Sequence, residues 1–600
     1  MRIFLIGLFI ASVVFSCASQ APQAERNTDW ASGIVWYQIF PERFNNGDPA
    51  NDPTADEVPG ADLQPGWQIH PWTSDWYKMQ PWEKKQSDRF YDVVFTRRYG
   101  GDLIGVIEKL DYLKELGVEA IYFNPVFEAP SLHKYDGSSY HHIDNNFGPD
   151  AKGDMQRLRQ ANETEDPSTW IWTKADSLFL QLIKEAHARG IKIVIDGVFN
   201  HTGTEFFAFQ DVIKNQQNSH YAHWYSVVSW DDPTTPQNEF DYKGWWGVKT
   251  LPELKEDENG IVDGPRQYIF NATRRWMDPN GDGDPSDGID GWRLDVAEEV
   301  AKPFWKEWYA LVKKVNPGAI VVTEIWHDAS GWIAENLTDA TMNYMFSRAV
   351  MEFFINHKMA ISAEEFAKKM NDLKERYGLK NLNLLWSMLD SHDTDRLASM
   401  ILNPDRGYDR QAGPRDNPQY VVRKPNQDER DIQKLIVAFQ MTFAGAPIIY
   451  YGDEAGMWGA DDPDDRKPMT WPEMTFEPES HHPLPGKTRP VDENGFDPEL
   501  FNFYKKLIQI RQQHPVLKQG DFQFISQSMT NDLLVIKRVL NEQQAYLVFN
   551  RSPEAQNVTI PDVTASSFRD VWRNSQVKTD GGQLKVAAPA RGFVILINDE

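Results

Sequence analysis

Short apolar segments alternate along most of the chain with segments whose apolar residues recur at helical spacing. Residues 103–116 place their Leu, Ile and Val residues on one helical face, and Gly117 follows as a stop signal. Residues 118–123 then form an apolar run of strand length. The same order returns as a helix over 176–189, begun by Asp176 as N-cap, and a strand over 191–195. Further strands are predicted at 34–40, 288–294, 319–323, 382–389 and 446–450, with a weak one near 342–345.

Eight strands separated by helices over about 420 residues indicate a parallel sheet of β/α units. A closed (β/α)8 TIM barrel over residues 33–519 agrees with this number and length. Three long polar and aromatic insertions interrupt it, at 42–100, 126–175 and 202–262, the last assigned as domain B. Short strands at 533–539, 544–549, 568–572 and 592–597 predict a separate antiparallel β-sandwich domain over 520–600.

The N-terminus has the layout of an export signal. An Arg precedes an apolar run over residues 3–15, which is too short to cross a bilayer, and Cys17 is the only cysteine. Residues 14–17, Val-Phe-Ser-Cys, resemble a bacterial lipoprotein signal, which implies a signal peptide over 1–17 and a tether over 18–32. We therefore expect a secreted protein that is lipid-anchored through Cys17 to a bacterial membrane, in the outer membrane or periplasm. The alternative is an ordinary signal peptide with an accidental cysteine.

The amino-acid composition limits which kinds of molecule the protein can bind. With 62 Lys and Arg against 88 Asp and Glu, the formal net charge is −26, which disfavours binding to nucleic acid. A hydrophobic fraction of 41% excludes a disordered chain. The 22 Trp residues suit both a core and the stacking of sugar rings. The sequence defines no oligomeric state.

Carboxylates stand at the ends of four predicted strands. Asp196, Asp295, Glu324 and Asp393 take these positions, and in a parallel barrel all such ends lie at one face. Arg293, His201 and His392 accompany them. A structural network explains any single one of these residues, but four strand ends with the same feature favour catalysis. Two carboxylates in different environments can act as nucleophile and general acid/base at a glycosidic bond.

Four segments carry a specific resemblance, in chain order: DGVFNH at 196–201, GWRLD at 291–295, TEIWH at 323–327 and SHD at 391–393. They resemble the four signature regions of the α-amylase family, glycoside hydrolase family 13. Flanking segments are similar to its neopullulanase and cyclomaltodextrinase branch: YQIFPERF at 37–44, NPVF at 124–127, HKYD at 133–136, LPEL at 251–254 and RKPMTW at 466–471. Ser139 departs from the Asp usual in the branch. We expect no extra N-terminal domain of the kind that the branch carries, and hence a more open cleft.

The resemblance implies a role for each matching residue. Asp295 would be the nucleophile, Glu324 the general acid/base, and Asp393 the stabiliser of the oxocarbenium-like transition state. Arg293 would keep Asp295 ionised. The other expected substrate contacts are Tyr140, which would stack on the sugar at the cleavage point, His201 and His392, which would bind its hydroxyls, and the pair Asp462 and Arg466, which would grip the next sugar.

Two loops rich in oxygen side chains are candidate calcium sites. The first, where the branch has a structural Ca²⁺, comprises Asn46, Asp48, Asn51, Asp52, Gly100 and Asp102. The second has the alternating spacing of an EF-hand-like loop and comprises Asp278, Asn280, Asp282, Asp284 and Asp287, but has Ile289 where the twelfth-position Glu is expected. An Asx-rich surface turn is the alternative for either loop.

The expected activity is retaining hydrolysis of α-1,4-glucosidic bonds in starch-derived glucans, such as maltodextrin, starch, pullulan or cyclodextrin. A transglycosylase on the same α-glucans is the first alternative, because the same three carboxylates serve both reactions. A non-catalytic glucan-binding surface protein is the second, and the intact set of three argues against it. No organic cofactor is expected.

Overall fold

The computed structural model describes residues 27–598. The predicted signal peptide, Cys17 and most of the tether lie outside these residues. No helix among the described residues is both long enough and apolar enough to cross a membrane.

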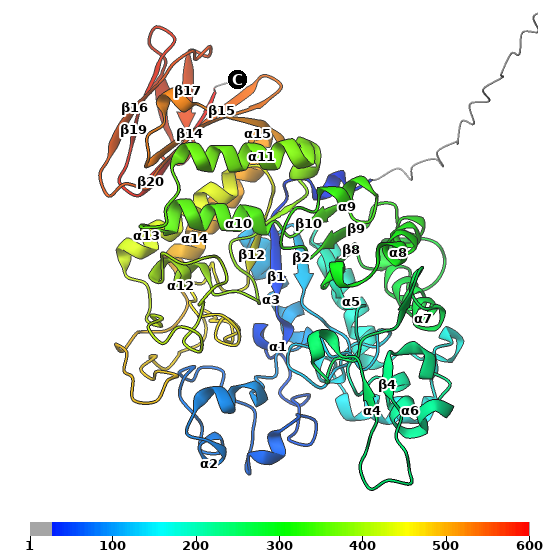
Figure 1. Cartoon of the computed structure of the whole chain (residues 1–600). Helices are drawn as coiled ribbons and strands as arrows, with labels where there is room; N and C mark the ends of the chain where they lie inside the picture. Colours follow the sequence, from blue (N-terminus) through cyan, green and yellow to red (C-terminus); the bar gives the residue numbers. More distant parts are fainter. Residues whose placement is uncertain (1–26, 599–600) are drawn as a thin grey trace, which may run out of the picture.

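Eight parallel strands form a ring at the centre of the molecule (Figure 1). Their order is β10-β9-β8-β3-β2-β1-β12-β11, and a single parallel bridge between Met342 and Trp386 closes the ring between β10 and β11. The strands are β1 (Trp36–Ile39), β2 (Ala120–Phe123), β3 (Lys192–Gly197), β8 (Gly291–Leu294), β9 (Ile320–Thr323), β10 (Ala340–Thr341), β11 (Trp386–Ser387) and β12 (Ala446–Tyr450). All of them are buried apart from Lys192, as strands covered on both faces must be. The predicted barrel is confirmed.

Helices surround the ring. They are α3 (Leu103–Leu116), α5 (Lys174–Ala188), α7 (Asp263–Met277), α8 (Lys302–Val315), α9 (Ser330–Ala334), α10 (Tyr344–Val350), α11 (Ala363–Leu382), α12 (Leu397–Leu402), α13 (Gln427–Thr442), α14 (Pro498–Gln513) and α15 (Pro515–Gln519). Helix α3 has the predicted bounds, because Asp102 caps its first turn and Gly117, at φ 100°, ends it.

Several predicted boundaries differ from the observed ones by a few residues, and two of the differences have a clear local cause. Helix α5 begins two residues early, because Thr173 is its N-cap and Asp176 is the third residue of a capping box. The weak strand near 342–345 lies instead at β10, since the side chain of Asn343 accepts a hydrogen bond from the backbone of Phe346 and starts α10. In both cases a side chain that bonds to the backbone decides the boundary.

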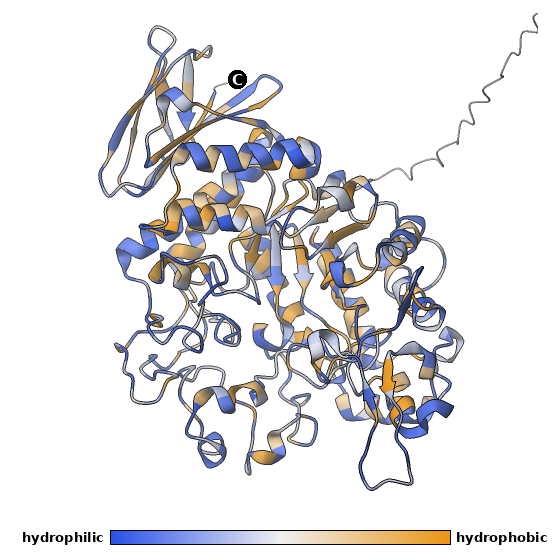
Figure 2. Ribbon diagram, viewed as in Figure 1, coloured by the Kyte–Doolittle hydropathy of each residue, from blue (hydrophilic) through white to orange (hydrophobic). Residues whose placement is uncertain are grey.

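The insertions gather at the end of the barrel where the strands terminate (Figure 1). The first holds α1 (Pro41–Phe44) and α2 (Glu83–Gln86), the second α4 (Ala151–Ala161), and the third α6 (Phe207–Asn215), β4 (Val227–Ser229), β5 (Asp241–Tyr242), β6 (Glu256–Asp257) and β7 (Gly260–Ile261). Figure 2 shows many hydrophilic residues on these segments, although β4 is hydrophobic.

The C-terminal part is an antiparallel β domain. Its six-stranded sheet has the order β13-β14-β15-β20-β17-β18, and β16 and β19 form a second sheet. The strands are β13 (Asp521–Phe524), β14 (Leu533–Leu540), β15 (Gln543–Asn550), β16 (Gln556–Ile560), β17 (Ser567–Asp570), β18 (Ser575–Lys578), β19 (Leu584–Ala588) and β20 (Gly592–Asn598). Phe522 of this domain packs on Phe443 of the barrel, with ring centroids 4.7 Å apart.

Candidate active site

Arg293 is a fully buried cation at the end of β8. One terminal nitrogen of its guanidinium lies 2.8 Å from Asp196 and 3.0 Å from Asp295, and the other lies 2.7 Å from Glu324. Three carboxylates from three neighbouring strand ends therefore share one rigid guanidinium. Because the guanidinium is planar and small, this sharing fixes Asp295 and Glu324 close to each other.

The Glu324 carboxylate is held by both of its oxygens. Oε2 accepts a hydrogen bond from the backbone N–H of Val296 (3.1 Å), and Oε1 accepts one from the indole of Trp326 (3.0 Å). Val296 has a φ of 38°, a strained value for a β-branched residue. Val296 directly follows Asp295, and its unusual backbone conformation directs its N–H toward Glu324. The backbone therefore links the positions of the Asp295 and Glu324 carboxylates.

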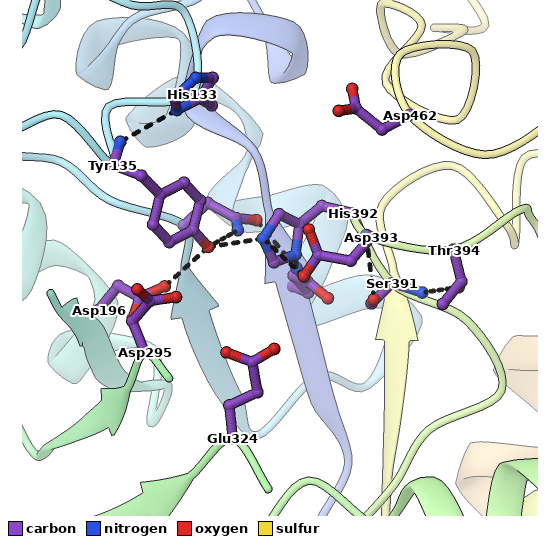
Figure 3. A network of polar contacts seen from close by, with 12 residues as sticks. His133, Tyr135, Asp196, Asp295, Glu324, Ser391, His392, Asp393, Thr394 and Asp462 are labelled. Atoms are coloured by element: carbon purple, nitrogen blue, oxygen red, sulfur yellow. Dashed lines mark hydrogen bonds and ion pairs between the residues drawn. The ribbon is translucent and has the colours of Figure 1, made fainter. Parts of the chain in front are cut away.

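Burial and neighbouring carboxylates raise the pKa of Asp295 and of Asp393. Burial raises the pKa of Asp295 well above its ordinary value; the Arg293 guanidinium opposes this, and the Glu324 carboxylate adds to it. Burial and the Glu324 carboxylate raise the pKa of Asp393 to about 7. Asp196 accepts hydrogen bonds from Tyr122 (2.6 Å) and Tyr135 (3.1 Å) besides its ion pair with Arg293. Asp196 is thus a saturated structural anion, whereas Asp295, Glu324 and Asp393 point into one space (Figure 3).

His392 is a neutral donor in this space. Burial lowers its pKa well below the ordinary value, and the nearby Arg466 guanidinium lowers it further. The Gln38 amide donates to Nδ1 (2.9 Å), so Nε2 carries the proton, facing the Tyr135 hydroxyl (2.5 Å) and Asp393 (3.2 Å). A ring nitrogen with its proton fixed in this way can donate to a sugar hydroxyl.

Asp393 and Asp462 are linked through Arg466. The guanidinium of Arg466 lies 3.2 Å from Asp393 and 2.9 Å from Asp462, and its Nε donates to the His392 carbonyl (2.7 Å). The Asp462 side chain is 40% exposed, and it lies farther out than the other carboxylates in Figure 3. The structure thus brings the two predicted residues together at the rim.

Tyr140, which we expect to stack on a sugar, packs into an aromatic cluster in this structure. Its ring is buried among Phe127, Phe199 and Phe206, and its hydroxyl donates to the His201 carbonyl (2.5 Å). Tyr135, in the HKYD segment, lies beside His392 instead. Its ring is parallel to that of His392, with centroids 5.5 Å apart.

His201 begins a stack of rings that ends at the surface. Its ring is buried, its Nε2 has no hydrogen-bond partner, and burial lowers its pKa to about 4. Trp245 stacks on His201 at 5.6 Å, and Trp246 stacks on Trp245 at 5.0 Å. Trp246 is 77% exposed. A neutral imidazole whose Nε2 has no partner, beside two stacked indoles, offers a hydrogen bond and a flat apolar surface for a sugar chain.

The first candidate calcium loop contains oxygens that lack partners. Asn46 Oδ1 and Asn51 Oδ1 are buried without a hydrogen-bond partner, and burial raises the pKa of Asp52 to about 7. Gly100 lies so close that a Cβ there would stand 1.8 Å from Asp52 Oδ1. Asp102 is occupied differently, because it accepts from three backbone N–H groups and from the Asn51 amide. Asp48 adds a further carboxylate to the loop. The unpaired oxygens and uncompensated charge suit a hard cation.

The second candidate loop, Asp278 to Asp287, is largely exposed, and within it Asp278 Oδ1 is buried without a hydrogen-bond partner. Three of its carboxylates, those of Asp278, Asp282 and Asp284, accept hydrogen bonds from the backbone of the loop itself, as does the Asn280 amide oxygen. Burial and the nearby Asp278 carboxylate raise the pKa of Asp287. The loop therefore folds as a series of Asx turns, in which each side-chain oxygen bonds to a nearby backbone N–H.

Known proteins match almost the whole chain. Residues 38–166 and 173–520 match the family described as "Alpha amylase, catalytic domain", and residues 522–595 match "Maltogenic Amylase, C-terminal domain". Neopullulanase 2 of Thermoactinomyces vulgaris is 35% identical over 94% of this chain and 78% of its own length. Cyclomaltodextrinase of Thermoanaerobacter pseudethanolicus is 33% identical over 93% of this chain and 76% of its own.

Solved structures of known hydrolases also superpose on most of this chain. The ligand-free cyclic α-maltosyl-(1→6)-maltose hydrolase of Arthrobacter globiformis superposes with a TM-score of 0.68 at 26% identity, over 95% of this chain and 100% of that chain. The type III pullulan hydrolase of Thermococcus kodakarensis gives a TM-score of 0.70 at 26% identity, over 96% and 83%. This protein belongs to the α-amylase family of glycoside hydrolases, glycoside hydrolase family 13.

Proposed function

We propose that the protein hydrolyses α-1,4-glucosidic bonds of starch-derived glucans with retention, through a covalent glycosyl-enzyme. The observation that carries this proposal is the single Arg293 guanidinium that contacts both Asp295 and Glu324. Retaining glycosidases need their two carboxyl groups only about 5–5.5 Å apart, too close for an intervening water molecule. A shared guanidinium favours such a close pair.

Each carboxylate has one task in the proposed reaction. Asp295 attacks the anomeric carbon while Glu324 gives its proton to the leaving oxygen, so that the glycosidic bond breaks as the ester bond to Asp295 forms. Glu324 then takes a proton from water, which attacks the same carbon and releases Asp295. Asp393, with His392, binds hydroxyls of the sugar and stabilises its developing positive charge. Tyr135 supplies the stacking surface, His201 a further hydrogen bond, and Arg466 with Asp462 the grip on the neighbouring sugar.

Product analysis tests the proposed activity. We expect maltoheptaose to yield only shorter oligosaccharides, and we expect action on pullulan or cyclodextrin, which the names of the relatives suggest as substrates. Longer products would indicate transglycosylation instead. Retained binding without any change in the oligosaccharide would indicate a glucan-binding protein and contradict the proposal.

Substitution of Arg293 by Lys tests the electrostatics of the site. Lys cannot reach Asp196, Asp295 and Glu324 at once, so the pKa of Asp295 should rise further. Activity requires ionised Asp295 and is lost as the pH falls through its pKa, so a higher pKa moves the acid limb of the kcat/KM profile to higher pH. The profile on a maltooligosaccharide should show this shift along with a lower maximum. An acid limb at the wild-type pH would contradict the assigned role of Arg293.

We also propose that the first loop binds a structural Ca²⁺. Asn46, Asp48, Asn51 and Asp52, with Gly100 and Asp102, would hold it, and the ion would neutralise the carboxylates of this loop beside α3. The support is the pair of buried Asn oxygens without partners and the raised pKa of Asp52.

Calcium removal should lower the stability of the fold. An ion at 100 times its Kd stabilises a protein by about 2.7 kcal/mol, so a Ca²⁺-selective chelator should lower the Tm and added Ca²⁺ should restore it. We expect one bound Ca²⁺ per chain, absent from Asp52→Asn. Asp282→Ala tests the second loop and should leave the count unchanged, because the carboxylates there bond to their own backbone. An Asp52→Asn protein that keeps its Ca²⁺ would refute the first site.

We propose, finally, that Cys17 carries a lipid anchor, as the signal-like sequence over residues 1–17 suggests. The wild type expressed in a bacterium should then partition into the detergent phase of a two-phase extraction, and Cys17→Ala into the aqueous phase. Equal aqueous partitioning of both would refute the anchor.

A further inference from the structure

A second cluster of ionisable side chains lies in the insertion between β2 and α5, outside the carboxylate site. His141 and His142 are buried, and Glu163 follows α4. One ligand atom of each of the three lies within 4.8 Å of the others, the one such group of His, Cys, Asp or Glu found in residues 27–598. The Nε2 atoms of His141 and His142 lie 3.3 and 2.8 Å from the same oxygen, Oε2 of Glu163.

The far side of each of these residues is fixed by another group. His142 Nδ1 is hydrogen-bonded to Asp176 (2.8 Å), and His141 Nδ1 to the Tyr268 hydroxyl (2.6 Å). Oε1 of Glu163 accepts from the backbone N–H of Ile171 (2.6 Å). In each of the three side chains, one nitrogen or oxygen atom thus points into the cluster, and the second is held by a group outside it. Metal-binding histidines are oriented by the same kind of outer carboxylate or hydroxyl.

We propose that His141, His142 and Glu163 form a binding site for a divalent transition-metal ion of the zinc class. Two imidazole nitrogens and one carboxylate oxygen suit Zn²⁺, whereas Ca²⁺ and Mg²⁺ prefer oxygen ligands alone. Zinc bonds of 2.0–2.1 Å put neighbouring ligand atoms of a tetrahedron about 3.3 Å apart. The separations of 3.3 and 2.8 Å to Glu163 need only small adjustment to reach that geometry.

Charge and access are compatible with an ion. Arg275 lies 3.1 Å from Asp176 and neutralises the charge of that carboxylate. The negative charge of Glu163 is then available to a metal ion. Trp170 covers His141, with the rings stacked at 4.2 Å. The Glu163 side chain is 12% exposed against 3% for each histidine, so an ion and a water molecule as fourth ligand would enter beside Glu163.

The ion would act as a structural link. Its ligands come from both ends of the segment that holds α4, and the outer partners of the two histidines, Asp176 and Tyr268, lie on α5 and α7. The Tyr268 hydroxyl also accepts from the Tyr140 backbone N–H (2.9 Å), and the Tyr140 hydroxyl donates to the carbonyl of His201. A metal here would brace the wall behind His201 without contacting substrate.

Metal binding by the full chain, without a histidine tag, tests the proposal. After removal of metals, equilibrium dialysis against Zn²⁺ should give one tightly bound equivalent in the wild type and none in His142→Gln or Glu163→Gln. His220→Gln is the matched control, because His220 forms an exposed pair with Glu165 (3.1 Å) in the same region and should keep the equivalent. Absence of stoichiometric Zn²⁺ in the wild type, or its retention in both site variants, would overturn the proposal.

X-ray absorption at the zinc edge makes the test independent of how the variants fold. The Zn²⁺ form of the wild type should show two imidazole ligands completed by oxygen. A zinc spectrum with no imidazole, or with only one, would overturn the proposal and leave the cluster as a hydrogen-bonded network of His142 between two carboxylates.

Discussion

Asp295→Asn should lower kcat on a maltooligosaccharide by about 10⁴-fold or more, the scale seen when an enzyme loses its nucleophile. The amide is nearly isosteric with the carboxylate but cannot form the glycosyl ester. KM should change little, because the hydroxyl contacts of His392, His201 and Asp393 remain. Steady-state kinetics with circular dichroism would measure both the loss and the retained fold.

The matched control lies at the other end of the same strand. Asp290, directly before β8, is a buried carboxylate paired with His187 (2.6 Å) and Lys192 (2.7 Å). Asp290→Asn should therefore lower the Tm and leave kcat near the wild-type value, because strand starts in such barrels serve stability and strand ends serve catalysis. Equal losses of kcat in the two variants would show that a buried carboxylate at either end of β8 matters through the fold alone.

Glu324→Gln should slow hydrolysis of maltooligosaccharides by about 10²–10⁴-fold, the usual contribution of general acid/base catalysis. A glucosyl fluoride needs no proton on its leaving group, so this variant should still form the glycosyl-enzyme from it. Breakdown of the ester needs a base, and azide, which reacts without one, should restore turnover. Glu298→Gln, an exposed carboxylate paired with His327 (3.0 Å), is the control and should behave as wild type. A variant that azide does not rescue would contradict the assignment of Glu324.

Sequence reasoning located the carboxylates because strand order fixes them. A parallel barrel brings the strand ends to one face, so Asp295, Glu324 and Asp393 could be placed together from their positions after apolar runs. The sequence predicts a contact of Arg293 only with Asp295, two residues away on the same strand face. Its reach to Glu324 depends on the pairing of β8 with β9.

Residues on irregular segments could not be placed in this way. Tyr135 and Tyr140 lie five residues apart in one insertion, and nothing in their local pattern shows which of them faces the substrate. Tertiary contacts decide it: Tyr140 enters an aromatic cluster, and Tyr135 reaches His392, 257 residues away along the chain. The stacking of Trp245 on His201 and the convergence of His142 on Glu163 depend equally on how the insertions fold back.

In the proposed mechanism, Asp295 forms a covalent bond to the sugar. Glu324→Gln treated with an α-glucosyl fluoride, then digested and analysed by peptide mass spectrometry, tests it most directly. We predict one added sugar unit on the peptide that contains Asp295, and its disappearance when azide is added. A sugar on the peptide of Asp196 or Asp393, or no covalent adduct together with a released product of inverted configuration, would contradict the account.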